Sequence, residues 1–204
     1  MPKITLISVQ SNKKNRCNVF VDGEFAFGLA VETAMQHRLK VGQEISEYDI
    51  KRITEDGERK DALDKAVNYV SKSLKTKKQV KTYLLGKGYS EQTACYVVDK
   101  LKEYNYINDE EYAKRYLESC SKNQGKRLSE YKLMMKGVRK EVIEKAYDNV
   151  EVSAKDDALK LAEKYMKNKE NTKENLVKAY RYLIGRGFSY DEADFALSGF
   201  KDED

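Results

Sequence analysis

The sequence has few of the residues that mark disulfide frameworks, metal sites and membrane spans. Its 204 residues include three cysteines and a single histidine, His37. The cysteines, Cys17, Cys95 and Cys120, are widely spaced and form no C-x-x-C pair, which is typical of reduced thiols in a cytoplasm. A lone histidine without neighbouring ligands does not predict a metal site. No stretch approaches the roughly 18 apolar residues of a membrane span, and the N-terminus does not resemble a signal peptide. We therefore expect a soluble cytoplasmic protein without a bound metal.

The familiar catalytic motifs are also missing. The sequence contains no GxxxxGK[ST], no HExxH, no GxSxG and no GxGxxG after a predicted strand. The carboxylates Asp109, Glu110 and Glu111 form the one cluster that could suggest acid–base chemistry, but acids in the first turn of a helix are explained by the helix dipole. We therefore predict a protein that is not an enzyme and needs no cofactor.

The composition predicts a folded chain with strongly charged surfaces. Apolar residues make up 40% of the sequence, enough for a modest core, and charged residues make up 36%. The net charge of +5 is a moderate basic excess. It weakly favours an anionic partner, although many soluble proteins with such a charge have none.

The first 30 residues predict a small β-sheet. The runs ITLISV (4–9), CNVFV (17–21) and EFAFGL (24–29) are rich in β-branched and aromatic residues. Asp22-Gly23 joins the last two and is a strong signal for a two-residue hairpin turn. We expect about three strands, packed on neighbouring helices, that serve either as a structural cap or as a docking surface.

The hairpin turn also predicts which side chains face each other. A two-residue turn places Phe20 opposite Phe25, and Val19 opposite Ala26 on the other face. Further along, Ser46 and Asp49 have the spacing of a capping box at the start of a helix. We expect Asp56-Gly57 to interrupt or end that helix and to mark the first domain boundary.

Three similar segments follow, each containing a helical pattern and a basic turn. The turns are LLGKGYS (84–90), LMMKGVR (133–139) and LIGRGFS (183–189), and their glycines Gly88, Gly137 and Gly187 are spaced by 49 and 50 residues. Each glycine comes just after a predicted helix, where a left-handed residue is needed, and the apolar residue after it can close the cap.

The helices before each turn repeat as well. An Ala-x-x-Tyr pair recurs in register, and the apolar spacing from residue 60 onward is helical. Thr76 with Gln79, Ser90 and Asn108 predict helix starts. Repeats of this size usually stack, because each one completes the core of its neighbour. The Ala-x-x-Tyr pairs are Ala66/Tyr69, Ala113/Tyr116 and Ala162/Tyr165.

The predicted fold class is mainly α, with tandem three-helix repeats that form an elongated, curved stack and a small N-terminal β-hairpin or sheet. The expected domains are 1–58 with the hairpin and short helices, the three-helix repeats 59–107, 108–151 and 152–200, and an acidic tail, 201–204.

Positive charge gathers around the second helix of each repeat. Residues 71–90 contain six lysines and no acid, whereas acids collect in the first and third helices. This pattern indicates either a solvated face or one basic ribbon across the stack that could bind a phosphate backbone or an acidic protein surface. The tyrosines Tyr69, Tyr83, Tyr116 and Tyr165 are more typical of core than of base stacking. The candidate binding residues are Lys77, Lys78, Lys81, Lys126, Arg127, Lys132, Lys136 and Arg186.

Several stretches resemble the RecX family of bacterial regulators of the RecA recombinase. They are VFVDGEFAFGL (19–29), GKGYSEQTACYVVDKLKEYNYIND (86–109) and YINDEEYAKRYLESCSKNQGKRLSEYKLMMKGVRKEVIEKAY (106–147). The resemblance covers nearly the whole chain and is weaker in the third repeat. It implies a regulatory protein that binds the RecA filament on single-stranded DNA and inhibits or modulates its extension, recombinase and co-protease activities, in DNA repair, homologous recombination and the SOS response.

The partners that the resemblance implies are therefore the RecA filament and DNA itself, with no membrane, and we expect a monomer. Here residues 77–84, KKQVKTYL, are richer in lysine than the family pattern suggests.

Two other functions remain open. One is a stand-alone nucleic-acid-binding repeat protein without a recombinase partner, and the other is a helical scaffold for a different protein.

Overall fold

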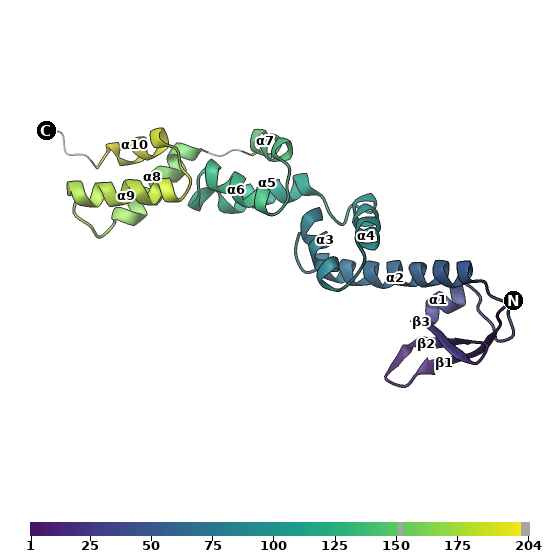
Figure 1. The fold of residues 1–204 in the computed structure, drawn as a ribbon. Helices are drawn as coiled ribbons and strands as arrows, with labels where there is room; N and C mark the ends of the chain where they lie inside the picture. The colour runs from purple at the N-terminus through teal and green to yellow at the C-terminus, as the bar shows by residue number, and fades with distance from the viewer. Residues whose placement is uncertain (151–152, 201–204) are drawn as a thin grey trace. The chain divides into compact units, whose positions relative to one another are not determined.

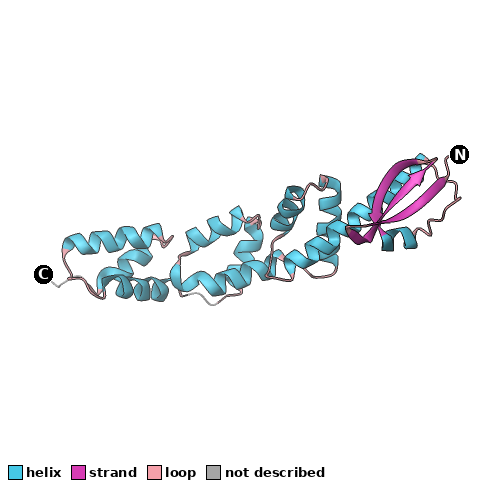
Figure 2. Ribbon diagram, turned by 90° about the horizontal axis from the view of Figure 1, so that it is seen from below, coloured by secondary structure: helices cyan, strands magenta, loops and turns pink. Residues whose placement is uncertain are grey.

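The computed structural model describes residues 1–150 and 153–200, which are mostly helical with a small antiparallel sheet near the N-terminus (Figures 1 and 2). The chain divides into two compact units. The first contains Met1–Ser73 and Val80–Tyr106, and the second contains Leu74–Gln79 and Ile107–Asp204.

The sheet has three strands in the order β1 (Ile4–Gln10), β2 (Lys13–Val21) and β3 (Glu24–Ala30). Asp22 and Gly23 form the predicted turn with φ angles of 50° and 89°, the left-handed values that a two-residue hairpin requires. The predicted pairing of Phe20 with Phe25 is confirmed, and the two rings meet edge to face with centroids 5.9 Å apart.

The predicted pairing of Val19 with Ala26 is wrong. Val19 pairs with Phe27, because the register shifts between Val19 and Phe20 and leaves Ala26 as an extra residue on β3. The shift brings Phe27 onto the buried face beside Val19, and Ala26 stays exposed. Burial of the larger aromatic side chain favours this register.

The inner face of the sheet forms a core with two helices. Strand residues such as Val19 and Leu29 are buried together with Ile53. The helices are α1 (Val31–Gln36) and α2 (Glu47–Val70), and the strands lie beside α1 and the N-terminal half of α2 (Figure 1). A three-stranded sheet is too small to be stable alone, and these helices supply the other side of its core.

The expected helix break at Asp56-Gly57 is also wrong. The Ser46–Asp49 capping box starts α2 as predicted, but the helix then runs through Gly57 to Val70 and crosses the boundary that we expected after residue 58. A Cβ atom on Gly57 would lie 3.7 Å from a Thr33 methyl and 3.8 Å from Leu29 Cβ. The packing of α2 against α1 and β3 therefore overrides the low helix propensity of glycine.

Three helical repeats account for the remainder of the described chain. Each repeat contains three helices. The C-terminal part of α2 serves as the first helix of the first repeat. The elements are α3 (Lys77–Gly86) and α4 (Glu91–Glu103); α5 (Asp109–Cys120), the 3-10 turn η1 (Ser121–Asn123), α6 (Lys126–Met135) and α7 (Lys140–Asp148); and α8 (Ala154–Met166), α9 (Lys173–Gly185) and α10 (Tyr190–Ser198).

The repeats have equivalent cores. The alanines of the three Ala-x-x-Tyr pairs, Ala66, Ala113 and Ala162, are each 0% exposed. Leucines before the glycine turns, Leu133 and Leu183 for example, are equally buried. Small residues at the alanine positions let the first helix approach its neighbours closely, which is why the sequence signal was so regular.

The predicted helix starts are confirmed at the level of single hydrogen bonds. The Thr76 hydroxyl accepts from the Gln79 amide at 3.2 Å, and the Gln79 side chain accepts from the Thr76 amide at 3.0 Å. Ser90 accepts from the Thr93 amide at 3.1 Å, and Asn108 from the Glu110 amide at 2.9 Å.

Candidate functional site: cationic repeat junctions

The three glycine turns are built alike. Gly88, Gly137 and Gly187 have φ angles of 88°, 87° and 89°. The amide of the next residue reaches back to a leucine carbonyl of the preceding helix, as in a Schellman cap, with distances of 3.3 Å for Tyr89, 3.0 Å for Val138 and 3.2 Å for Phe188. The predicted left-handed caps are therefore confirmed.

The second turn also receives the first residues of α3. The Thr76 hydroxyl, fully buried, donates to the Lys136 carbonyl at 2.6 Å, and the Lys78 ammonium donates to the Met135 carbonyl at 3.3 Å. The Lys77 amide donates to Asp109 at 3.0 Å. A Cβ atom on Gly137 would overlap the Lys78 side chain. We call this contact the first junction.

The third turn receives the first residues of α6 in the same way. The Gly125 amide donates to the Arg186 carbonyl at 2.9 Å, and the Arg127 amide donates to the Gly187 carbonyl at 3.3 Å. A Cβ atom on Gly187 would overlap Leu128, and one on Gly125 would overlap the Gly187 carbonyl. This second junction therefore depends on glycine on both sides.

Gly88 has no such neighbour. A Cβ atom there would meet nothing within 4 Å, and the turn is exposed. In this turn the Tyr89 hydroxyl instead donates a hydrogen bond to Asp61 on α2 at 2.5 Å and accepts one from the Lys65 ammonium at 2.6 Å. Burial, followed by the hydrogen bond to Asp61, raises the pKa of Tyr89.

Six of the eight predicted binding residues gather at these two junctions. The first junction carries Lys77, Lys78 and Lys136, and the second carries Lys126, Arg127 and Arg186. At both places, two cations come from the start of a second helix, and one comes from the turn that receives it. The repeated basic turns of the sequence thus contribute to two clusters of the same construction.

The other two predicted residues lie outside the clusters. The Lys132 ammonium donates to the Gln124 side chain at 2.7 Å. Lys81 belongs to the other compact unit and pairs with Glu91 at 2.7 Å, and this hydrogen bond raises the pKa of Lys81. Neither residue has the junction environment of the remaining six.

Carboxylates compensate the second cluster only weakly. Lys126 and Glu130 approach to 3.9 Å with the lysine side chain 58% exposed, a geometry that contributes little binding energy. Lys126 also lies 4.9 Å from the centre of the Tyr147 ring, whose hydroxyl donates to the Lys126 carbonyl. Burial raises the pKa of Tyr147 to about 12, so this phenol stays neutral at physiological pH. A cleft of about 360 Å³ opens beside Lys126 and Arg127, and the carboxylate residues Glu130 and Glu192 also line it.

The tyrosines of the repeats stack on one another. Tyr69 lies on Tyr83 with ring centroids 4.2 Å apart, and Tyr165 lies on Tyr182 at 4.7 Å. The turn cation Arg186 lies 5.0 Å from the Tyr182 ring. In the second repeat Tyr116 stacks on Tyr112 with ring centroids 6.5 Å apart, and its hydroxyl accepts a hydrogen bond from Gln124. These rings are half-buried structural contacts and do not stand free as stacking platforms.

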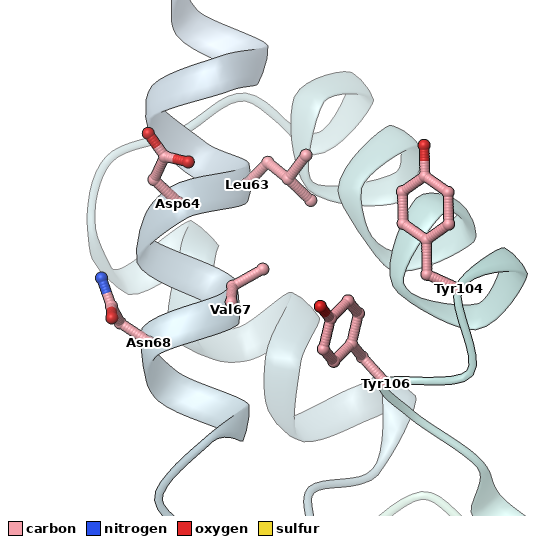
Figure 3. Close-up of a pocket in the computed structure, with 6 residues that line it drawn as sticks. All are labelled: Leu63, Asp64, Val67, Asn68, Tyr104 and Tyr106. Atoms are coloured by element: carbon pink, nitrogen blue, oxygen red, sulfur yellow. The ribbon is translucent and has the colours of Figure 1, made fainter.

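Two features of the candidate site were not predicted from the sequence. Thr76 and Gly125 hold the junctions, and their equivalent positions at the start of each second helix could have marked them. The second missed feature is an open groove of about 780 Å³ in the first repeat, between α2 and the end of α4 (Figure 3). Its lining residues are Leu63, Asp64, Val67, Asn68, Tyr104 and Tyr106.

Metal clusters and membrane-spanning helices are absent from the described residues 1–150 and 153–200. The described His, Cys, Asp and Glu side chains form no group of three or more that could hold a metal ion. Within residues 1–150 and 153–200, every helix is too short or too polar to cross a membrane. The cysteines Cys17, Cys95 and Cys120 are free thiols.

The fold and these junctions define a class of protein. In this class, tandem three-helix repeats follow a small antiparallel sheet, and basic residues lie where the second helix of one repeat meets the glycine turn of the following repeat. Family models match consecutive parts of the chain in the same order. The RecX N-terminal domain matches residues 2–46, and the first, second and third RecX three-helix domains match residues 62–101, 108–146 and 155–197.

Curated relatives and solved structures agree with these matches. The regulatory protein RecX of Clostridium botulinum is 36% identical over 200 residues, covering 94% of this chain and 92% of the relative. The regulatory protein RecX of Clostridium tetani is 34% identical over 201 residues, covering 96% of this chain and 93% of the relative.

A crystal structure of regulatory protein RecX, 25% identical, matches all of both chains with a TM-score of 0.72. The structure of RecX from Lactobacillus salivarius, 24% identical, covers 70% of this chain and 96% of that one with a TM-score of 0.63, which shows the fold alone. The chain belongs to the RecX family of regulatory proteins.

Proposed function

We propose that this chain is a non-enzymatic regulator that binds the RecA filament on single-stranded DNA and restrains its extension, recombinase activity and co-protease activity. Membership of a family of regulatory proteins supports this proposal. The observation that carries it is the repeated junction, which brings six basic residues together in two groups of three. Such a protein acts in homologous recombination, DNA repair and the SOS response.

The chemistry of the clusters suits phosphate groups. The Arg127 and Arg186 guanidinium groups can each present paired donors to a phosphate. The Gly125 amide bonds to the Arg186 carbonyl at 2.9 Å and the Arg127 amide to the Gly187 carbonyl at 3.3 Å, so the backbone is fixed and only the side chains need ordering when a ligand binds. Both arginines are exposed residues, and Arg127 lines an open cleft together with Lys126.

The direct test is inhibition of the DNA-dependent ATPase of RecA. We expect inhibition at sub-stoichiometric amounts of the chain, because one bound regulator can block the growth of a filament. The double charge reversal Arg127→Glu with Arg186→Glu should weaken this inhibition about tenfold or more, since it replaces two attractions by repulsions at one site.

A matched control separates the cluster from the overall charge. Lys114→Glu with Lys160→Glu changes the net charge by the same amount, and these lysines are exposed on α5 and α8, away from both junctions. The control should inhibit like the unmodified chain. If equimolar wild-type chain leaves the ATPase unchanged, the proposed function is wrong.

A stand-alone nucleic-acid-binding role is the second candidate, because the clusters would suit any phosphate backbone. The two functions differ in partner preference. A filament regulator binds RecA-coated DNA more tightly than bare single-stranded DNA, whereas a stand-alone binder loses affinity when RecA covers the phosphates. A direct comparison of the two affinities at one salt concentration decides between them.

A further inference from the structure

The groove of the first repeat has an apolar floor between two helices. Leu63 and Val67 of α2 point toward α4, and the Tyr106 ring extends into the same space, with Tyr104 on the opposite wall (Figure 3). Tyr104 and Tyr106 are 57% and 52% exposed. Large aromatic groups left this exposed beside aliphatic side chains are typical of a binding surface.

The corresponding groove of the second repeat is charged. When the repeats are aligned on Ala66 and Ala113, the positions of Leu63 and Val67 are occupied by Glu110 and Lys114 in the second repeat. The cleft there has a volume of about 430 Å³, smaller than the groove of the first repeat. The other charged residues that line it are Glu111, Lys145 and Asp148. In the third repeat the equivalent positions are Leu159 and Glu163. Apolar residues at both positions therefore occur in the first repeat alone among the three, and the repeat architecture does not require them.

The wall of the groove has its own structural origin. Helix α4 has 13 residues, whereas α7 and α10 have 9 each. After the helix ends at Glu103, Asn105 adopts a left-handed conformation with φ of 58°, and the Tyr106 amide donates to the Leu101 carbonyl at 2.8 Å. This cap fixes the backbone on both sides of Asn105 and holds the two tyrosines beside the groove.

The charges of the groove favour a basic occupant over a polyanion. Asp64 lines it, and no lysine or arginine is among its lining residues. Lys100 lies 5.9 Å from the centre of the Tyr104 ring, but its ammonium is already paired with Glu103 at 2.8 Å. A basic side chain beside an apolar anchor would find both an acid and an apolar pocket in this groove.

We propose that this groove receives a segment of a protein partner, with an apolar side chain among Leu63, Val67 and Tyr106 and a basic side chain beside Asp64. The inference rests on the proposed function, in which that partner is the recombinase of the filament. It assigns protein recognition to the first repeat and phosphate recognition to the junctions.

The test compares binding of each variant to RecA filaments and to bare single-stranded DNA by fluorescence anisotropy. Tyr104→Ala with Tyr106→Ala should lower the affinity for filaments about tenfold or more, because truncation of two aromatic anchors removes most of a small binding site. The affinity for bare DNA should not change. The matched control is Tyr48→Ala with Tyr131→Ala, which removes two tyrosines that are 73% and 61% exposed elsewhere.

A charge reversal keeps the test independent of the aromatic truncation. Asp64→Lys should also weaken filament binding, and Asp99→Lys on the exposed side of α4 should not. Unchanged filament affinity of the Tyr104/Tyr106 variant overturns the inference, and so does an equal loss on bare DNA, which would indicate base stacking. A wild-type chain that binds no filaments contradicts the proposed function itself, a result that is distinct from both.

Discussion

The three turn glycines have the same backbone conformation but different surroundings. Their φ angles lie between 87° and 89°, a left-handed region that costs an alanine about 1 kcal/mol. Gly88 faces open space, Gly137 faces the Lys78 side chain, and Gly187 faces Leu128 together with its backbone. In the first repeat, glycine is therefore required by the backbone conformation alone. In the other two repeats it is also required by the close contact with a neighbouring residue.

Alanine substitution should separate these two constraints. We expect Gly88→Ala to lower the free energy of unfolding by about 1 kcal/mol, the backbone cost alone. Gly137→Ala should cost more, and Gly187→Ala the most, about 2 kcal/mol or more, because overpacking against a neighbouring backbone adds to it. Urea unfolding followed by circular dichroism measures all three. Equal losses would show that the junction contacts do not constrain these positions.

Gly57 presents the opposite case. It lies inside α2 with an ordinary helical conformation, and a Cβ atom would make normal contacts of 3.7 and 3.8 Å with Thr33 and Leu29. Gly57→Ala should therefore raise the free energy of unfolding by about 0.5–1 kcal/mol, through helix propensity and reduced freedom of the unfolded chain. A loss of stability in the same urea titration would mean that α2 is bent or broken at this point.

The starts of α3 and α9 provide a matched pair of elements. Thr76 and Thr172 both cap their helices through a hydroxyl that accepts from the third amide, at 3.2 and 3.3 Å. Only Thr76 is buried and donates to a turn carbonyl, whereas Thr172 is exposed. The comparison thus isolates what the first junction adds to an ordinary helix cap.

Thr172→Ala should cost about 1 kcal/mol, the usual value of an N-cap. Thr76→Ala should cost about 2–3 kcal/mol, because it also leaves the Lys136 carbonyl without this donor in a buried contact. Thermal unfolding gives the two losses. Thr76→Ser, which keeps the hydroxyl, should recover most of the difference, and failure to do so would assign the loss to packing of the methyl group.

The sequence was most informative where structure depends on neighbours in the chain. The Asp22-Gly23 turn, the Ser46 and Thr76 capping boxes and the glycine caps all depend on bonds within a few residues, and all were predicted. The continuity of α2 through Gly57 was not predicted, because it depends on packing against Thr33 and Leu29. The shift at Val19 likewise follows from burial of Phe27 across the sheet.

The candidate site shows the same limit. The basic residues were visible as a periodic excess, but their grouping follows from contacts between residues about 60 positions apart, such as Thr76 with Lys136. Lys81 has the same residue type and helix as Lys77 and yet pairs with Glu91. Charge periodicity can therefore indicate which elements are basic, but not which of their cations share one place.

At the scale of the whole molecule, the net charge of +5 is too small to explain tight binding of a polyanion by itself. The 39 basic and 34 acidic residues nearly balance, so that any strong attraction must come from local excess. The junctions provide such an excess, because their cations outnumber the carboxylates that contact them.

The salt dependence of binding to bare single-stranded DNA distinguishes local charge from net charge. Each phosphate contact contributes about 0.7 to the slope of log affinity against log salt. Arg127→Ala with Arg186→Ala should therefore lower the slope by about 1.4, twice that single-contact value. Lys114→Ala with Lys160→Ala removes the same charge from exposed positions on α5 and α8 and should leave the slope unchanged. Equal slopes for both variants would show that the chain attracts DNA through its overall charge and that the junction clusters contact no phosphates.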